Sequence, residues 1–255
     1  MEEITIKILE KPKLKDPILI EGLPGIGLVG KLAADHLLDE LKAKKIAELY
    51  SHNLPPQVMI QEDGTIQLVD MEFYYRKGKK NDIILLVGDF QGITPDGQYR
   101  LAEKTIEIAK AWKVTRIYTL GGLGTGNLTK NPRVFGAATD KKIIKELSKA
   151  NIYFKGGGAI LGASGLLIGL GMQQGIEGVC LMGETHGQII DAKSAEAVLG
   201  VLTSILGFKI DMAALVEKAK DTEEQMTKIG QMIAATQQAE EQQKRFLSES
   251  PSYIR

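Results

Sequence analysis

Hydrophobic residues in the first 207 positions of the chain follow two alternating patterns. Short apolar runs bounded by Gly, Pro or Asp are typical of β-strands, and longer segments with apolar residues at i, i+3 and i+4 are typical of amphipathic helices. We predict strands at residues 3–9, 17–21, 45–50, 65–70, 71–76, 82–88, 115–122 and 177–183. We predict helices at residues 31–43, 97–113, 140–150 and 192–207.

This alternation of strands and helices predicts an α/β domain with a largely parallel sheet covered by helices. The strands between residues 45 and 76 have no helix between them, which predicts hairpins and therefore a mixed, partly parallel sheet. A block rich in Gly and Ala at residues 156–175 predicts a buried helix with its turns. No linker precedes Gly207, so we expect one core domain over residues 1–207.

The composition changes after Asp211. Residues 211–250 are rich in helix formers and contain no Pro, which predicts one long helix whose roughly 38 residues would extend about 57 Å at 1.5 Å per residue. Residues 251–255 are expected to form a flexible tail. The helix carries a thin apolar stripe that consists of Leu215, Met226, Ile229, Met232, Ile233 and Phe246. Because so little apolar surface leaves a helix marginal alone, it either projects and frays or pairs with a copy of itself.

Composition and charge narrow the classes of function. Thirty-two basic and thirty-two acidic residues give no net charge, so nothing attracts the chain as a whole to nucleic acid or to an anionic membrane. Cys180 stands alone and cannot form an internal disulfide. No apolar run approaches the roughly 20 residues of a membrane helix, and the N-terminus does not resemble a signal peptide. We expect a cytoplasmic protein without nucleic-acid or membrane partners.

Residues 22–33, GLPGIGLVGKLA, contain two nucleotide-binding patterns at once. Gly25, Gly27 and Gly30 form G-x-G-x-x-G, and the run from Gly25 to Lys31 forms G-x-x-x-x-G-K. Both patterns place a glycine-rich turn between a strand and a helix, where free backbone amides can bind phosphate.

Two residues weaken the nucleotide interpretation. Leu32 stands where a phosphate loop needs a Ser or Thr hydroxyl for magnesium. Glu48 lies near the spacing at which a dinucleotide fold holds the ribose, but apolar residues flank it on both sides. We therefore favour a structural turn whose glycines permit close packing of helix and strand, and we keep a nucleotide-binding function as the alternative.

A second glycine-rich segment, GGLGTGN at residues 121–127, follows a predicted strand. Ligands of open α/β sheets bind at such strand ends. Lys130 and Arg133 follow shortly after and are either ligand contacts or surface charges. The alternative function is therefore a ligase or transferase that uses the glycine-rich loops at 22–30 and 121–126.

Glu184, His186 and Asp191 offer groups for acid–base chemistry. The sequence shows no nucleophile to act with them, and we favour Glu184 as a cap of the following helix. The chain's histidines are dispersed, which does not indicate a metal site. We therefore predict no catalytic, cofactor-binding or metal-binding residues.

Six segments occur in an order and spacing that resembles a known family. They are EGLPGIGLVGKLAADHL, NLPPQV, IILLVGDFQGITPDGQYRLAEKTIEIA, TLGGLGTG, PRVFGAATD and GVCLMGETHGQIIDAKSAEAVL. Over residues 4–215 the chain resembles the archaeal proteasome assembly chaperone family, homologues of the second eukaryotic proteasome assembly chaperone. The resemblance implies a three-layer α/β/α core similar to nucleoside phosphorylases, without catalytic residues. It also implies an oligomeric chaperone of core-particle subunits, although some members have been labelled as similar to ATP-grasp ligases.

The C-terminal residues bear on this implied role. Some members of the family end in a hydrophobic residue, Tyr and one last residue, which insert between proteasome subunits. This chain ends PSYIR, so Tyr253 is displaced from that pattern by one residue, or about 3.3 Å. Tyr253, Ile254 and Arg255 are therefore either partner contacts or a frayed end.

Together these observations predict a non-enzymatic, homo-oligomeric chaperone that assists assembly of the proteasome core particle or a related complex. We expect a cyclic oligomer of more than two subunits, without a cofactor, whose C-terminal helices grip a client or partner. The expected partners are further copies of the chain and proteasome subunits or another assembly factor. The helix residues assigned to partner contact are Met226, Ile229, Met232 and Ile233.

Overall fold

The computed structural model describes residues 3–127, 129–154 and 157–218. Within these ranges a nine-stranded mixed sheet has the order β1-β3-β6-β7-β2-β8-β11-β9-β10. Its strands are β1 (Ile4–Ile8), β2 (Ile18–Glu21), β3 (Lys44–Ser51), β6 (Met71–Arg76), β7 (Ile83–Gly88), β8 (Arg116–Gly124), β9 (Val134–Ala138), β10 (Ile152–Tyr153) and β11 (Glu177–Thr185). The helices are α1 (Val29–Leu41), α2 (Pro95–Ala111), α3 (Lys141–Glu146), α4 (Gly162–Gln173) and α5 (Ala192–Leu206).

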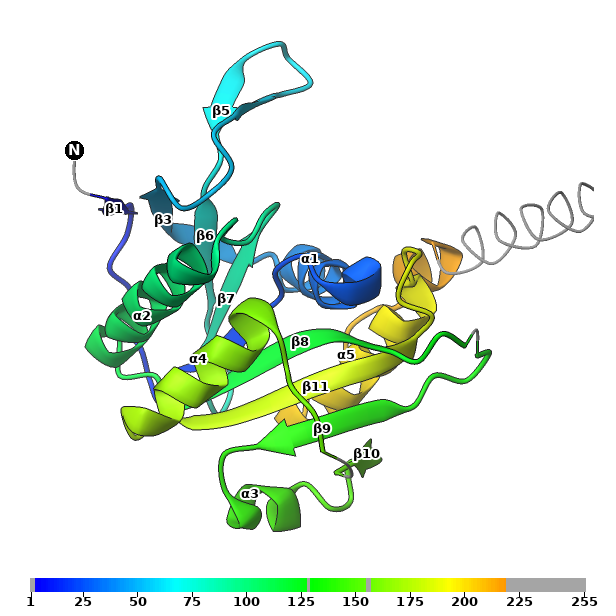
Figure 1. Ribbon diagram of the computed structural model, residues 1–255. Helices are drawn as coiled ribbons and strands as arrows, with labels where there is room; N and C mark the ends of the chain where they lie inside the picture. Colours follow the sequence, from blue (N-terminus) through cyan, green and yellow to red (C-terminus); the bar gives the residue numbers. More distant parts are fainter. Residues whose placement is uncertain (1–2, 128, 155–156, 219–255) are drawn as a thin grey trace, which may run out of the picture.

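Helices α2 and α4 cover one face of the sheet, and α1 and α5 cover the other (Figure 1). A separate hydrophobic core fills each of the two spaces between sheet and helices. Strands β7, β2, β8 and β11 run parallel in the centre, while β1, β3 and β6 pair antiparallel along one side. The predicted three-layer α/β/α fold with a mixed, partly parallel sheet is confirmed.

The predicted strands and helices are all present, and several features differ from prediction. The predicted strand at 65–70 contributes only β5 (Ile66–Leu68), which pairs with the unpredicted β4 (Val58–Ile60) in a separate hairpin. Strands β9 and β10 were not predicted either. The strand predicted to end at Gly122 continues to Gly124.

The ends of the helices follow local sequence signals. The Thr94 hydroxyl accepts a hydrogen bond from Gly97 N at 3.0 Å, and Pro95 occupies the first helical position of α2. Helix α5 ends at Gly207, whose φ of 71° suits a residue without a Cβ. None of the helices within the described ranges is long and apolar enough to span a membrane.

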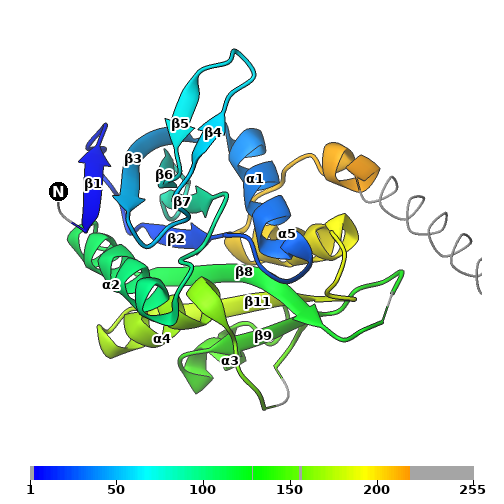
Figure 2. The same cartoon turned by 45° about the horizontal axis from the view of Figure 1, so that its top comes forward.

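The β4–β5 hairpin extends away from the body of the sheet (Figure 2). Val58 pairs with Leu68 and Ile60 pairs with Ile66, so these four side chains share one face of the hairpin. All four are exposed to solvent. The hairpin therefore presents an aliphatic surface that the described part of the chain leaves uncovered.

Beyond α5 the chain returns to α1. His36 Nε2 lies 2.7 Å from the backbone oxygen of Asp211, and Asp211 N donates to Glu40 Oε2 at 3.0 Å. A helix is present at residues 213–218, and its Leu215 is only 1% exposed. The remainder of the predicted C-terminal helix lies outside the described residues, so its existence as one long helix stays a prediction.

Candidate functional site

The carboxyl ends of β2, β7, β8 and β11 meet at one edge of the sheet because these strands are parallel. Open α/β sheets bind ligands in the crevice at this edge. The first glycine-rich segment follows β2 here and leads through a short 3₁₀ turn, Ile26–Leu28, into α1. This edge is therefore the place to test the nucleotide alternative.

The glycines of this segment are used for packing. A Cβ added to Gly30 would lie 2.1 Å from the backbone oxygen of Leu120, and one added to Gly22 would lie 2.2 Å from Ala34 Cβ. Helix α1 thus rests directly on β8, which a larger residue would prevent. Gly27 has a φ of +63°, and its backbone oxygen accepts from Asp191 N at 2.9 Å. The contacts agree with the structural interpretation of the turn.

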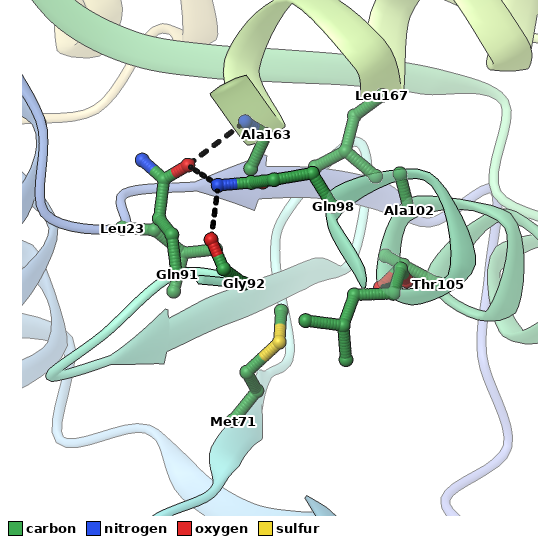
Figure 3. Close-up of a pocket in the computed structure, with 10 residues that line it drawn as sticks. Leu23, Met71, Gln91, Gly92, Gln98, Ala102, Thr105, Ala163 and Leu167 are labelled. Carbon is green, nitrogen blue, oxygen red and sulfur yellow. Dashed lines mark hydrogen bonds between the residues drawn. The ribbon is translucent and has the colours of Figure 1, made fainter. Parts of the chain in front are cut away.

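The side-chain amide of Gln91 ties together the loops at this edge (Figure 3). Its Nε2 donates to Pro24 O at 2.6 Å, which holds the glycine-rich turn. Its Oε1 accepts from Ala163 N at 3.0 Å and from Gln98 Nε2 at 3.1 Å, which holds α4 and α2. The cavity beneath Gln91 has a volume of about 10 Å³, room for about one water molecule. The crevice is closed by the protein's own side chains.

Glu21 ends β2 and is fully buried below this closure. Its Oε1 accepts from Leu23 N at 2.9 Å, and its Oε2 accepts from the Ser164 hydroxyl at 3.0 Å. Burial raises the pKa of Glu21 to about 7, although these hydrogen bonds act in the opposite direction. A carboxyl group that can take up a proton near neutrality is typical of active sites, but this one has no contact with solvent. Protonation of Glu21 therefore affects the stability of the fold.

The second glycine-rich segment is not a loop over its first half, contrary to our expectation. Gly121 to Gly124 belong to β8 and pair with residues 182–185 of β11. Pairing along the full length of two neighbouring parallel strands extends the strand beyond its last apolar residue. Residues 121–124 therefore cannot form the phosphate-binding loop of the alternative function.

Glu184 does not cap α5, and that prediction is wrong. It forms a bidentate ion pair with Arg133, whose Nε donates to Glu184 Oε2 and whose Nη2 donates to Glu184 Oε1, each at 2.8 Å. The cap of α5 is Asp191, whose carboxylate accepts from Ser194 N at 2.9 Å. Lys130 is a surface charge. The ion pair lowers the pKa of Glu184, so it stays ionised and is used for structure, not for acid–base chemistry.

Glu48 lies away from the glycine-rich turn, because β6 and β7 separate β3 from β2 in the sheet. It cannot hold a ribose beside that turn. Instead it joins Asp70 and Glu72, two carboxylates that the sequence interpretation did not single out. The signal available in the sequence was the i, i+2 spacing of Asp70 and Glu72, which places both on one face of a strand.

The edge also carries exposed aliphatic side chains on the loops that Gln91 and Asp191 hold together. They are Ile26, Ile93, Leu161 and Ile190. Exposed aliphatic residues grouped in this way are typical of surfaces that contact proteins. The partner-contact residues predicted from the sequence, Met226, Ile229, Met232, Ile233, Tyr253, Ile254 and Arg255, lie outside the described residues.

Fold and site together define a three-layer α/β/α protein in which the crevice beside the glycine-rich turn is closed by Gln91. The model of a protein family described as the PAC2 family matches residues 19–229, and the chain belongs to this family. The family resemblance seen in the sequence is thereby confirmed.

Three relatives illustrate the similarity. An uncharacterized protein of Methanocaldococcus jannaschii is 43% identical over 227 residues, which cover 89% of this chain and 88% of that protein. The crystal structure of Pyrococcus furiosus PbaB, described as an archaeal proteasome activator, is 44% identical with a TM-score of 0.87, covering 90% of this chain and 100% of that one. Pyrococcus furiosus PbaA, described as an archaeal homolog of proteasome-assembly chaperone, is 28% identical with a TM-score of 0.75, covering 92% and 99%.

Proposed function

We propose that this protein is a non-enzymatic, homo-oligomeric chaperone that binds the proteasome core particle or its subunits in the cytoplasm. The observation that carries the proposal is the similarity to PbaB, which extends over the whole of that chain. Because one relative is described as a proteasome activator and another as an assembly-chaperone homologue, the two roles share this fold. Binding to core-particle subunits is the common element.

The geometry of the carboxyl edge supports protein binding over small-molecule chemistry. Gln91 closes the crevice, and the cavity below it holds about 10 Å³. Ligand pockets usually have several hundred Å³ and convergent polar groups. Ile26, Leu161 and Ile190 instead place apolar surface at the outer side of this edge. Exposed apolar side chains suit a protein partner.

The C-terminal part of the chain supplies the second element of the proposal. Met226, Ile229, Met232 and Ile233 form an apolar stripe on the predicted helix, and flexible methionine side chains suit an adaptable groove. We propose that this stripe grips a client or a neighbouring subunit in a cyclic oligomer. Tyr253, Ile254 and Arg255 are proposed contacts to the core particle.

The test uses the full-length chain and core particles from the same source. Native electrophoresis with the mature particle, and with isolated α and β subunits, separates an activator from an assembly factor. Peptide hydrolysis by the particle gives a second readout. A variant with the four stripe residues replaced by Ser should keep its melting temperature and lose binding. Failure of the wild-type chain to bind the particle or either subunit would refute the proposal.

The same preparations test the nucleotide alternative. Calorimetric titration with ATP, ADP and NAD in the presence of magnesium should give no saturable heat. Tight nucleotide binding that Gly25→Ala abolishes, in a variant that stays folded, would favour a ligase or transferase instead. Gly25 is suited to this test because a Cβ there has open space around it.

A further inference from the structure

Three carboxylates beside the carboxyl end of β7, away from the glycine-rich turn, are brought together by the register of β3 and β6. Glu48 pairs directly with Glu72 in this antiparallel pair. Asp70 precedes β6 by one residue, so it shares a face with Glu72. One oxygen from each of the three carboxylates lies within 4.8 Å of the others. Like charges directly opposite each other destabilise a sheet, so this cluster needs a cation.

Two lysines partly neutralise the cluster. Lys45 Nζ contacts Glu72 and lies 3.5 Å from Glu48 Oε1, and Lys7 Nζ lies 3.0 Å from Glu48 Oε2. Both glutamates are therefore paired with ammonium groups.

Asp70 differs from the two glutamates in its hydrogen bonding. It is only 8% exposed, and its Oδ2 has no hydrogen-bond partner within the described part of the chain. The Tyr50 hydroxyl lies nearby, but it has one proton and donates it to Glu48 Oε2 at 2.9 Å. A buried carboxylate oxygen without a partner costs stability, which points to a ligand.

A polar cavity of about 170 Å³ adjoins Asp70 and Glu72. It lies between the base of the β4–β5 hairpin, α1 and the ends of β6 and β7, and has room for several water molecules. On its far side Lys31 pairs with Asp35 at 2.8 Å and Asp89 at 3.1 Å. Lys31 brings one positive charge to these two carboxylates, so the groups around the cavity carry an excess of negative charge on both sides.

We propose that Glu48, Asp70 and Glu72 form a binding site for a hard divalent cation of the Mg²⁺ and Ca²⁺ class. Carboxylate oxygens are the ligands that such cations prefer, and water from the adjoining cavity completes the coordination. In this arrangement Lys45 is the competitor of the cation. Its side chain is 29% exposed and can turn into solvent when the cation binds.

Terbium luminescence tests the site directly. Tb³⁺ takes the oxygen ligands of Ca²⁺ and luminesces when an excited tyrosine lies close to it. Tyr50 and Tyr74 donate hydrogen bonds to Glu48 and Glu72 at 2.9 and 2.8 Å, so both are placed to sensitise the ion. We expect saturable luminescence that Ca²⁺ or Mg²⁺ reverses. At a hundredfold excess over Kd, Ca²⁺ or Mg²⁺ should raise the melting temperature by roughly 5–10 °C over NaCl of equal ionic strength.

Two variants separate a cation site from a merely structural cluster. Asp70→Asn should weaken binding by at least about tenfold. Without the cation it should melt no lower than the wild type, because the amide relieves repulsion in the cluster. Lys45→Met removes the competing ammonium and should bind the cation more tightly. Glu103→Gln on the exposed side of α2 makes the same change of charge outside the cluster and should bind like the wild type.

Three results would overturn the proposal. One is a wild-type chain that shows neither saturable luminescence nor a rise in melting temperature with Ca²⁺, Mg²⁺ or Mn²⁺. Another is an Asp70→Asn variant that binds as tightly as the wild type. The third is weaker binding by a folded Lys45→Met variant, since a structural cluster would lose its bridging ammonium without gaining a ligand.

Discussion

At the scale of single residues, Gly25 and Gly30 belong to the same nucleotide-like pattern but have different surroundings. A Cβ at Gly30 would lie 2.1 Å from the Leu120 oxygen, whereas at Gly25 the nearest atom is Gln91 Nε2 at 4.0 Å. We predict that Gly30→Ala lowers the free energy of unfolding by at least about 2 kcal/mol, because backbone must move to relieve the overlap. Gly25→Ala should change it little. Urea unfolding of both variants checks this, and equal effects would contradict the packing argument.

Gly27 adds a conformational requirement. Its φ is +63°, and an added Cβ would lie 2.9 Å from Thr185 Oγ1. We predict that Gly27→Ala impairs folding through strain and overlap and not through loss of a cofactor. Thermal melts and nucleotide titration are the two measurements. A variant that melts like the wild type but loses a measured nucleotide affinity would show the opposite.

Glu21 makes the free energy of unfolding decrease as the pH rises. Its pKa is about 7 in the folded chain and near the ordinary 4.5 when unfolded. Between these values the folded state holds a proton that the unfolded state has released, so raising the pH favours unfolding. The contribution is fully present below pH 4.5 and is lost as the pH rises through 7, a change of about 3 kcal/mol.

We predict that Glu21→Gln flattens this dependence, because an uncharged amide keeps the same shape without a titrating proton. Unfolding free energies at pH 5, 6, 7 and 8 should fall less steeply for the variant than for the wild type. The control is Glu103→Gln, an exposed site that should leave the slope unchanged. Parallel slopes for wild type and Glu21→Gln would refute the assignment.

At the scale of elements, periodicity predicted the strands that are buried on both faces. All six residues of β7 are buried, so the uninterrupted run IILLVG is enough to predict a strand. Strand β9, VFGAA, contains small residues and exists because it pairs with β11, about 45 positions further along the chain. The extension of β8 through Gly124 depends on the same partner. Tertiary pairing of this kind leaves no local pattern.

The candidate sites likewise divide into those that the local sequence predicts and those that depend on tertiary pairing. The structural role of the glycine-rich turn could be predicted, because Leu32 stands where a phosphate loop needs a magnesium-binding hydroxyl. The Arg133–Glu184 pair joins residues 51 positions apart, so local reasoning assigned Glu184 to the nearest helix. The three-carboxylate cluster requires the register of Glu48 against Glu72, which hydrophobic patterning alone did not fix.

The β4–β5 hairpin gives a prediction at this scale. Ile60 and Ile66 are 78% and 69% exposed and pair with each other. Replacing both with Thr keeps strand propensity and should change stability by no more than about 0.5 kcal/mol. We expect weaker self-association or core-particle binding, measured by light scattering and native electrophoresis, because exposed aliphatic surface is typical of protein contacts. Met172→Gln, at an exposed position of α4, is the control. Unchanged association in the double variant would exclude the hairpin as a contact.

At the scale of the whole molecule, the boundary between core and C-terminal segment depends on α1. Phe208, Ile210 and Met212 pack against the core on the side of α1 and α5, and Leu215 is part of that core. The hydrogen bond between His36 Nε2 and the Asp211 backbone oxygen, and the one that Asp211 N donates to Glu40 Oε2, fix this return of the chain. We therefore expect the autonomous unit to include residues up to 218, beyond the boundary at Gly207 expected from composition.

Two truncations test this boundary together with the proposed gripping segment. A chain of residues 1–218 retains the contacts that Leu215 makes within the described residues and should melt cooperatively at nearly the full-length temperature. A chain of residues 1–207 uncovers the apolar surface beneath Leu215, so it should melt lower or aggregate. Circular dichroism melts and light scattering distinguish the two outcomes.

Binding measurements on the two truncated chains then distinguish a loss of folding from a loss of function. Since Met226, Ile229, Met232 and Ile233 lie beyond position 218, the 1–218 chain should be well folded and yet lose affinity for the core particle or its subunits. The 1–207 chain cannot give this information, because loss of binding there would follow from instability. If 1–218 binds as tightly as the full chain, recognition belongs to the α/β/α core, and the exposed aliphatic residues at its carboxyl edge and on its hairpin become the surface to mutate next.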